Sequence, residues 1–117
     1  MTERSLVSTH VLDASSGAPA PGVSVTLQAD GGADAAADVT VSSGITDLQG
    51  RVADLGPSSL TAGRYRLTFE SGRYFAERGV ETFYPAVEIV FEVLADCSHY
   101  HVPLLLSPFA FTTYRGS

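Results

Sequence analysis

HYHVPLLLSPFAFTTYRGS, residues 99–117, reads as two strands joined by a turn at Ser107-Pro108. Side chains alternate between the two faces of a strand, and one face of the first strand is wholly apolar: Val102, Leu104 and Leu106. The other face combines two histidines with apolar residues: His99, His101, Pro103 and Leu105. An apolar face with histidines is unusual toward solvent, so we expect it to meet another subunit and treat this segment as the candidate site.

Length and composition predict one all-β domain, residues 1–117. Of the 117 residues, 44% are hydrophobic, which is enough for one packed core. There is no Trp, there are 11 Gly and 6 Pro, and Val, Thr, Tyr and Phe fall in short runs. This composition favours strands over helices.

Charge and residue usage exclude several function classes. The net charge of −6 does not favour binding to nucleic acid or to an anionic membrane. All seven basic residues are arginine, which excludes Schiff-base, pyridoxal-phosphate and lysine-base mechanisms. Residues 1–5 do not begin a signal peptide, and the single Cys97 cannot form an internal disulfide. We therefore expect a cytoplasmic location.

Five segments before the terminal pair read as strands: Leu6–Ala14, Val23–Leu27, Val39–Thr46, Gly63–Glu70 and Val87–Val93. The one helix candidate is residues 71–77, with Ser71 as N-cap and Gly79 closing the helix. A tight turn at residues 47–50 presents Arg51 at a strand boundary. Seven or eight short strands and one short helix are typical of a β-sandwich.

These motifs together resemble the transthyretin-like family over essentially the full length, and within it the 5-hydroxyisourate hydrolases of purine catabolism. Six stretches carry the resemblance: STHVLD (8–13), GAPA (17–20), TDLQGR (46–51), FYP (83–85), HYHVPLLLSP (99–108) and YRGS (114–117). The final tetrapeptide combined with the histidine-containing run is the most specific signal.

The resemblance implies a transthyretin-type sandwich of two four-stranded sheets with one short helix. It also implies a homotetramer, a dimer of dimers with active sites in the channel between the dimers. The implied activity is a hydrolase without cofactor or metal that opens the six-membered-ring amide of 5-hydroxyisourate. The implied product is 2-oxo-4-hydroxy-4-carboxy-5-ureidoimidazoline, on the route from urate to allantoin.

The resemblance also implies the site residues. The implied catalytic residues are His10, Arg51, His101 and Ser117. The implied substrate-binding residues are His10, Arg51, Tyr114 and Arg115. Amide hydrolysis needs a base for water, support for the oxyanion and a proton for the leaving nitrogen. Two histidines can divide the first and last tasks, in an order that the sequence leaves open, while an arginine holds carbonyl groups.

The terminal residues 114–117 are expected to fold back onto the face that carries the histidines. Gly116 would permit the backbone turn that this requires. Phe109 and Phe111 are expected to help fill the core.

Two other function classes remain open at this stage. A carrier could use the same channel for a small aromatic ligand, although the vertebrate hormone carrier has lysine in place of His10 and lacks the YRGS ending. A metal site could form from His10, His99 and His101, with an open position for water. His99 is as consistent with a structural role as with an active one, and Cys97 reads as an inert thiol.

Overall fold

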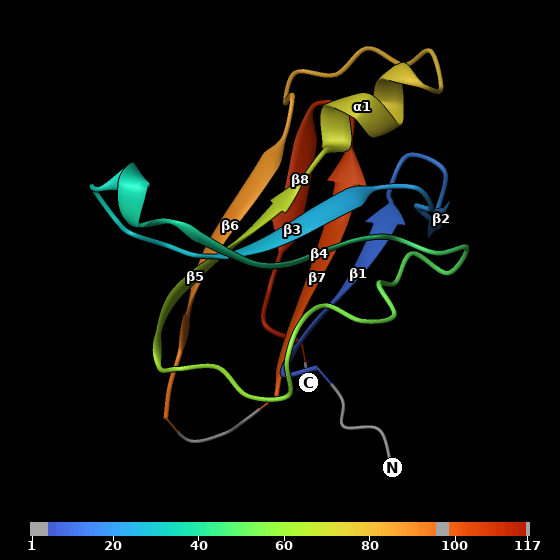
Figure 1. Cartoon of the computed structure of the whole chain (residues 1–117). Coiled ribbons are helices and arrows are strands. Elements are labelled where there is room, and N and C mark those ends of the chain that lie inside the picture. The colour runs from blue at the N-terminus through green and yellow to red at the C-terminus, as the bar shows by residue number, and fades with distance from the viewer. Residues whose placement is uncertain (1–4, 96–98, 117) are drawn as a thin grey trace.

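The computed structural model describes residues 5–95 and 99–116 and has two facing four-stranded sheets (Figure 1). The strand orders are β2-β1-β7-β8 and β4-β3-β5-β6. The strands are β1 (Val7–Asp13), β2 (Ala18–Pro19), β3 (Ser24–Ala29), β4 (Val39–Ile45), β5 (Gly63–Phe69), β6 (Val87–Val93), β7 (Tyr100–Ser107) and β8 (Ala110–Thr113). The helical elements are α1 (Ser71–Ala76) and the 3-10 turn η1 (Ala35–Ala37). The predicted all-β sandwich with one short helix is confirmed.

The core lies between the sheets and is built by alternation. Along β1, every second side chain is buried, beginning with Val7. The predicted inward residues of β5 and β7 are all buried: Tyr65, Leu67, Phe69, Val102, Leu104 and Leu106. Each fully buried aliphatic or Phe side chain stabilises the fold by about 1.5–3 kcal/mol relative to exposure.

The expectation that Phe109 and Phe111 fill the core is wrong for this chain. Phe109 is 63% exposed because it lies in the turn between β7 and β8 rather than on a strand. Phe111 is 38% exposed, since β8 is an edge strand, and its ring packs edge-on against Tyr84 with centroids 5.3 Å apart.

The boundaries of α1 differ from the sequence prediction at its start. Ser71 is not the N-cap, because it is the first helical residue and Glu70 occupies the cap position without a side-chain capping bond. The Ser71 side chain is buried, which removes it from a capping role. Gly79 closes the helix as predicted, with a φ of 68° and its N–H bonded to the Ala76 carbonyl at 3.1 Å.

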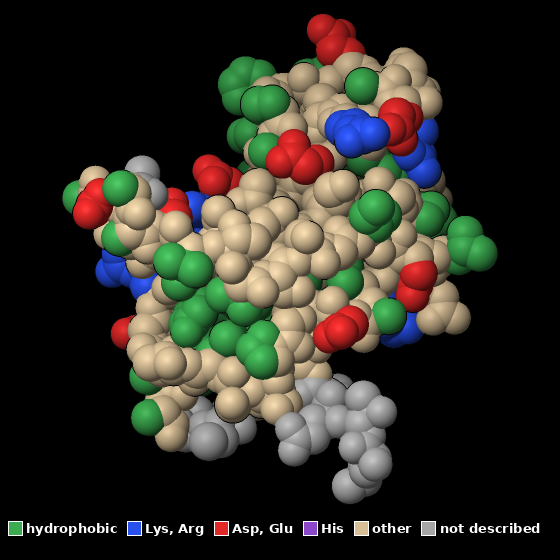
Figure 2. All heavy atoms as spheres, viewed as in Figure 1, with side chains coloured by type: hydrophobic (Ala, Val, Ile, Leu, Met, Phe, Trp, Pro, Cys, Tyr) green, Lys and Arg blue, Asp and Glu red, His purple; other side chains and the backbone are tan. Residues whose placement is uncertain are grey.

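Acidic side chains are scattered over the face shown in Figure 2 rather than gathered in one cluster. The net negative charge is therefore dispersed on this side of the molecule. Among the residues that the structure describes, no helix is long and apolar enough to cross a membrane.

The pairing of the first long strand with the terminal hairpin positions the candidate site. β7 and β8 form the predicted antiparallel hairpin, with Ser107 opposite Ala110. β1 lies parallel to β7 on its other side, with Val7 opposite Tyr100 and Asp13 opposite Leu106. Figure 1 shows the two strands running side by side, although they come from opposite ends of the sequence.

A buried carboxylate ties α1 to the end of β1. The Tyr74 hydroxyl donates to Asp13 Oδ2 at 2.9 Å, while the Ser15 N–H donates to Oδ1 at 3.0 Å. Burial alone raises the pKa of Asp13, but the hydrogen bonds from Ser15, Tyr74 and Ser16 outweigh it and hold this pKa below 3.8. Burial and the bond to Asp13 raise the pKa of Tyr74 to about 12.

We expect Tyr74→Phe to lower the free energy of unfolding by about 1.5–3 kcal/mol, the range for a hydrogen bond to a charged group. A lowered folded-state pKa stabilises the fold above the unfolded value and loses that effect as pH falls through the folded value. The difference between wild type and Tyr74→Phe should therefore be constant between pH 3.8 and pH 10 and shrink below pH 3.8. It should also shrink above pH 10, because the raised pKa of Tyr74 adds stability that is lost as pH rises through about 12. Denaturant unfolding of both proteins over this pH range measures it, and a difference that grows in acid would contradict the assignment.

Candidate active site

The candidate site lies on the outer face of the sheet β2-β1-β7-β8. In the parallel pair, Ser8 is opposite His101 and His10 is opposite Pro103. The neighbours of these residues in both strands point into the core, so the four side chains share the outer surface. We call this surface, formed by Ser8, His10, His101 and Pro103, the histidine face. It brings together two of the histidines that the sequence singled out.

Ser8 bridges the two histidines of the terminal segment. Its Oγ lies 2.8 Å from His101 Nδ1 and 2.9 Å from His99 Nε2. His99, which the sequence left between a structural and an active role, is thus linked to His101 through one hydroxyl. Ser8 is not among the predicted site residues, although its position two residues before His10 puts it on the same face.

The turn at residues 47–50 brings Arg51 to the site as expected. The Asp47 carboxylate accepts hydrogen bonds from the backbone N–H groups of Gln49 and Arg51, at 2.8 and 3.0 Å. Both bonds lower the pKa of Asp47, and the bond from Arg51 has the larger effect. Gly50 has a φ of 79°, and a Cβ there would collide with the Val11 carbonyl. Arg51 then pairs with His10 in an antiparallel bridge. Glycine at position 50 is therefore required for the turn to pack against β1.

The same turn fixes the tautomer of the neutral His10 ring. Its Nε2 lies 2.7 Å from the Gln49 carbonyl oxygen, which can only accept a hydrogen bond. Nε2 therefore carries a proton in both the neutral and the charged ring, and the neutral ring has Nδ1 as its acceptor. A backbone contact of this kind has no signal in the sequence pattern.

Burial first, and then the positive groups His99, His10 and Arg51, lower the pKa of His101 below 6.5. His10 and His101 lie on paired strands, two positions apart in the register, and Arg51 pairs with His10, so the three predicted residues lie close together. At neutral pH the His101 ring is mainly uncharged and can accept a proton.

The terminal segment folds back beside His101, as expected. The Gly116 N–H donates to the His101 carbonyl at 2.8 Å, and the two residues form an antiparallel bridge. Glycine was expected at this position because of a backbone turn. The structure shows a different reason, which is that the Gly116 backbone lies close against the His101 and Pro103 side chains. A Cβ on Gly116 would lie 2.5 Å from His101 Cδ2 and 3.2 Å from Pro103 Cγ. Any side chain here would press on the imidazole ring.

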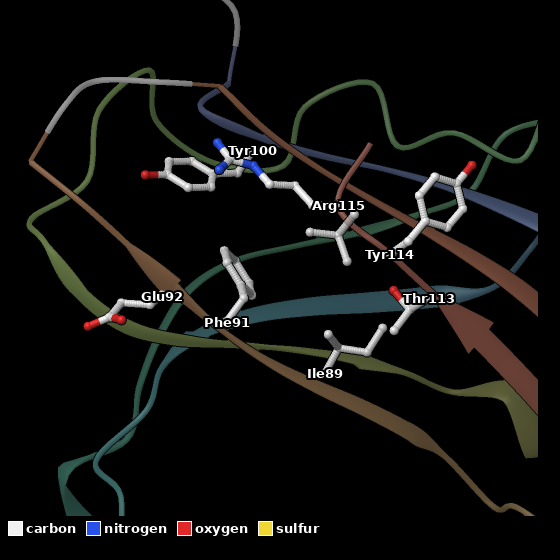
Figure 3. A pocket seen from close by; sticks show the side chains of 8 residues that line it. Ile89, Phe91, Glu92, Tyr100, Thr113, Tyr114 and Arg115 are labelled. Atoms are coloured by element: carbon white, nitrogen blue, oxygen red, sulfur yellow. The ribbon is translucent and has the colours of Figure 1, made fainter. Parts of the chain in front are cut away.

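Tyr114 and Arg115 lie beside a cavity on the other side of the terminal strands (Figure 3). The Arg115 guanidinium lies over the Tyr100 ring, 4.7 Å from its centroid, at a mainly apolar cavity of about 200 Å³ that also contacts Val102. Tyr100 and Val102 are on the opposite face of β7 from His101. Tyr114 also lines this cavity and is 57% exposed. Their predicted contact with substrate remains a prediction.

Two residues of the sequence analysis, Ser117 and Cys97, lie outside the described residues. The proposed metal site needs His10, His99 and His101 to converge on one ion. Within the described parts of the chain, no three His, Cys, Asp or Glu side chains are placed to hold a metal ion. His99 and His101 share hydrogen bonds to the Ser8 hydroxyl, whereas His10 is bonded to the Gln49 carbonyl.

Proteins of similar sequence include the 5-hydroxyisourate hydrolases of mouse and of Salmonella typhi. The mouse 5-hydroxyisourate hydrolase is 45% identical, and the match covers 99% of this chain and 98% of the mouse protein. The 5-hydroxyisourate hydrolase of Salmonella typhi is 41% identical, with 96% of this chain and 81% of that protein covered.

Two solved structures of similar fold are a hydrolase and a transthyretin, so the fold alone does not distinguish these two kinds of protein. The Klebsiella pneumoniae 5-hydroxyisourate hydrolase has a TM-score of 0.82 and 41% identity, over 95% of this chain and 98% of that one. Transthyretin from Sparus aurata has a TM-score of 0.87 and 31% identity, over 97% of both chains. The fold is thus common to both proteins, whereas the identity is higher with the hydrolase. Residues 7–116 match the model of the HIUase/Transthyretin family, and the chain belongs to that family.

Proposed function

We propose that this protein hydrolyses 5-hydroxyisourate, opening its six-membered-ring amide to give 2-oxo-4-hydroxy-4-carboxy-5-ureidoimidazoline. The main support is the cluster of His10, Arg51 and His101 on the histidine face, which supplies the three functions that amide hydrolysis needs. The identity of 41–45% to 5-hydroxyisourate hydrolases over nearly the whole chain supports the same substrate.

The proposed reaction adds water to the ring carbonyl and breaks its bond to nitrogen. One imidazole accepts a proton from the attacking water, and the carbonyl oxygen becomes an oxyanion. Arg51 is exposed and permanently charged, so it can stabilise that oxyanion without acting as the base. The leaving nitrogen takes a proton from an imidazole, and the products are a carboxylate and a ureido N–H group.

We expect Arg51→Lys to lower kcat/KM by at least about tenfold, because lysine keeps the charge but loses the planar donor pair that two carbonyl oxygens can share. The turn should survive, since its hydrogen bonds to Asp47 involve backbone N–H groups. Steady-state kinetics and thermal unfolding of the variant test both points. Unchanged kinetics would remove Arg51 from the proposed mechanism.

We further propose that the active form is a homotetramer, a dimer of dimers, and that it works in the cytoplasm. In a single chain the side chains of Ser8, His10 and His101 are only partly buried and Arg51 is exposed, so the described residues leave this face open. A second copy across this face would exclude water and strengthen the electrostatic contacts. Light scattering of the purified protein measures the assembly directly.

One assay separates a hydrolase from a carrier. Freshly prepared product of urate oxidase is mixed with the protein, and the ultraviolet absorbance of 5-hydroxyisourate is followed. A hydrolase accelerates the decay catalytically at substoichiometric protein. A carrier binds its ligand and leaves the decay at the spontaneous rate, which would refute the proposal.

The same assay tests the absence of a metal requirement. We expect dialysis against a chelator to leave the rate unaltered and elemental analysis to find well under one metal ion per chain. A rate that falls on chelation and returns with zinc would restore the three-histidine interpretation.

A further inference from the structure

Ser8 lies at the centre of a chain of hydrogen bonds from His99 to His101. The proposed reaction gives no role to Ser8 or His99. Its Oγ contacts one ring nitrogen of His99 and one of His101, at 2.9 and 2.8 Å. A serine hydroxyl has one proton to donate and two lone pairs that accept. With both rings neutral, it donates to one imidazole and accepts from the other.

This arrangement couples the tautomers of the two histidines. If Ser8 donates to His101 Nδ1, then His99 Nε2 must carry a proton and donate to Ser8. If Ser8 donates to His99 Nε2, then His101 carries its proton on Nδ1. Only the second arrangement leaves the other His101 nitrogen, Nε2, as a lone-pair acceptor for water.

We propose that Ser8 and His99 are positioning residues that hold His101 in the Nδ1–H tautomer and accept its surplus proton during turnover. This inference rests on the proposed function, because the need for a base toward water selects the second arrangement, but the tautomer itself can be measured without substrate. As His101 Nε2 takes a proton from water, Nδ1–H passes its proton to Ser8 Oγ, and the Ser8 hydroxyl proton passes to His99 Nε2. His10 protonates the leaving nitrogen, and the relay steps reverse when the proton on His101 Nε2 returns to His10, so the relay gains and loses no proton overall.

The surroundings of His101 explain why such a relay is useful. The groups that oppose a positive charge on this ring are His99, His10 and Arg51, in addition to burial. The relay keeps His101 uncharged and moves the charge to His99, at the start of β7. The Arg115 guanidinium contacts the His99 backbone carbonyl at 3.4 Å, so that end of the relay is also held in place by the terminal segment.

The first test reads the tautomer without substrate. NMR of the histidine ring nitrogens, at a pH where the rings are neutral, should show His101 protonated at Nδ1 in the wild type. Ser8→Ala should shift His101 toward the Nε2–H tautomer, and Ser8→Thr, which keeps the hydroxyl, should not. A wild-type His101 protonated at Nε2, or a tautomer that is insensitive to Ser8→Ala, would overturn the proposal whatever the enzyme's substrate.

The second test is kinetic and uses a double-mutant cycle. We expect Ser8→Ala and His99→Phe each to lower kcat by about 10- to 100-fold with little change in KM. His101 is still present as the base in both variants, but it is no longer held in the Nδ1–H tautomer and has no group to accept its proton. Since both act through one chain, the double variant should be no slower than the slower single variant. Multiplicative losses would show two independent structural effects and refute the relay.

Ser107→Ala is the matched control for the loss of a hydroxyl. Ser107 ends β7, six residues beyond His101, and its hydroxyl donates to the Ala110 carbonyl at 2.9 Å. This variant should keep the wild-type kcat and the wild-type His101 tautomer. A wild type that fails to hydrolyse 5-hydroxyisourate would refute the proposed function, whereas the NMR result would still decide the relay.

Discussion

His101→Asn should lower kcat by at least about a hundredfold, the lower bound for loss of a general base or acid. His101 is bonded to Ser8, is close enough to His10 and Arg51 for their charges to shift its pKa, and is covered on one side by Gly116. Asparagine has no group that titrates near neutrality, so it can fill the space without exchanging protons. His10→Asn should cause a loss of similar size, because the two imidazoles divide the proton transfers.

The fold should tolerate both substitutions. His10 and His101 are only partly buried and lie on the outer face, so the core between the sheets is unaffected. Thermal unfolding and light scattering of each variant, alongside steady-state kinetics, separate catalysis from folding. Near-normal turnover in a folded variant would exclude that histidine from the proposed mechanism.

The pH dependence gives a second check on His101. Because its pKa is lowered from 6.5, the ring remains uncharged, and able to act as a base, down to a pH below 6.5. We therefore expect the acid limb of kcat/KM, which reports the unliganded enzyme, to lie below pH 6.5. An acid limb above that value would contradict an uncharged His101 in the active form.

Local periodicity predicted much of the fold and part of the site. Alternation along residues 99–107 and 63–70 identified the buried faces correctly, because a strand with one buried face needs an apolar side chain at every second position. The same parity put His101 on the face opposite the core. The motifs shared with the family then assigned Arg51 to the same site as the histidines. The position of Arg51 after a turn would not have indicated this by itself.

Other features depend on contacts between distant parts of the chain, which periodicity does not encode. Ser8 became part of the site only through the parallel register of β1 with β7. Gly116 was expected to permit a backbone turn, but its neighbour in space, the His101 ring, is what requires a glycine. Phe111 has the alternation of a core residue, yet its strand is at the edge of a sheet, where one chain alone cannot cover it.

Deletion of residues 114–117 should abolish measurable hydrolysis while the sandwich still folds. The deletion removes the Gly116 hydrogen bond to the His101 carbonyl and the packing of Gly116 against the imidazole. It also removes Arg115 from the Tyr100 ring and from the His99 carbonyl. The core residues of β1, β5 and β7 are untouched, so the protein should still unfold cooperatively, at a moderately lower temperature.

Gly116→Ala tests the same contact while keeping every other terminal residue. One added methyl group would lie 2.5 Å from His101 Cδ2, so either the imidazole or the terminal segment has to move. Because small displacements of a catalytic group can cost about a hundredfold in rate, we expect kcat to fall by roughly that factor with little change in thermal unfolding. If the deletion variant and Gly116→Ala both kept full activity, the terminal segment would be a spectator, and His101 would hold its position without it.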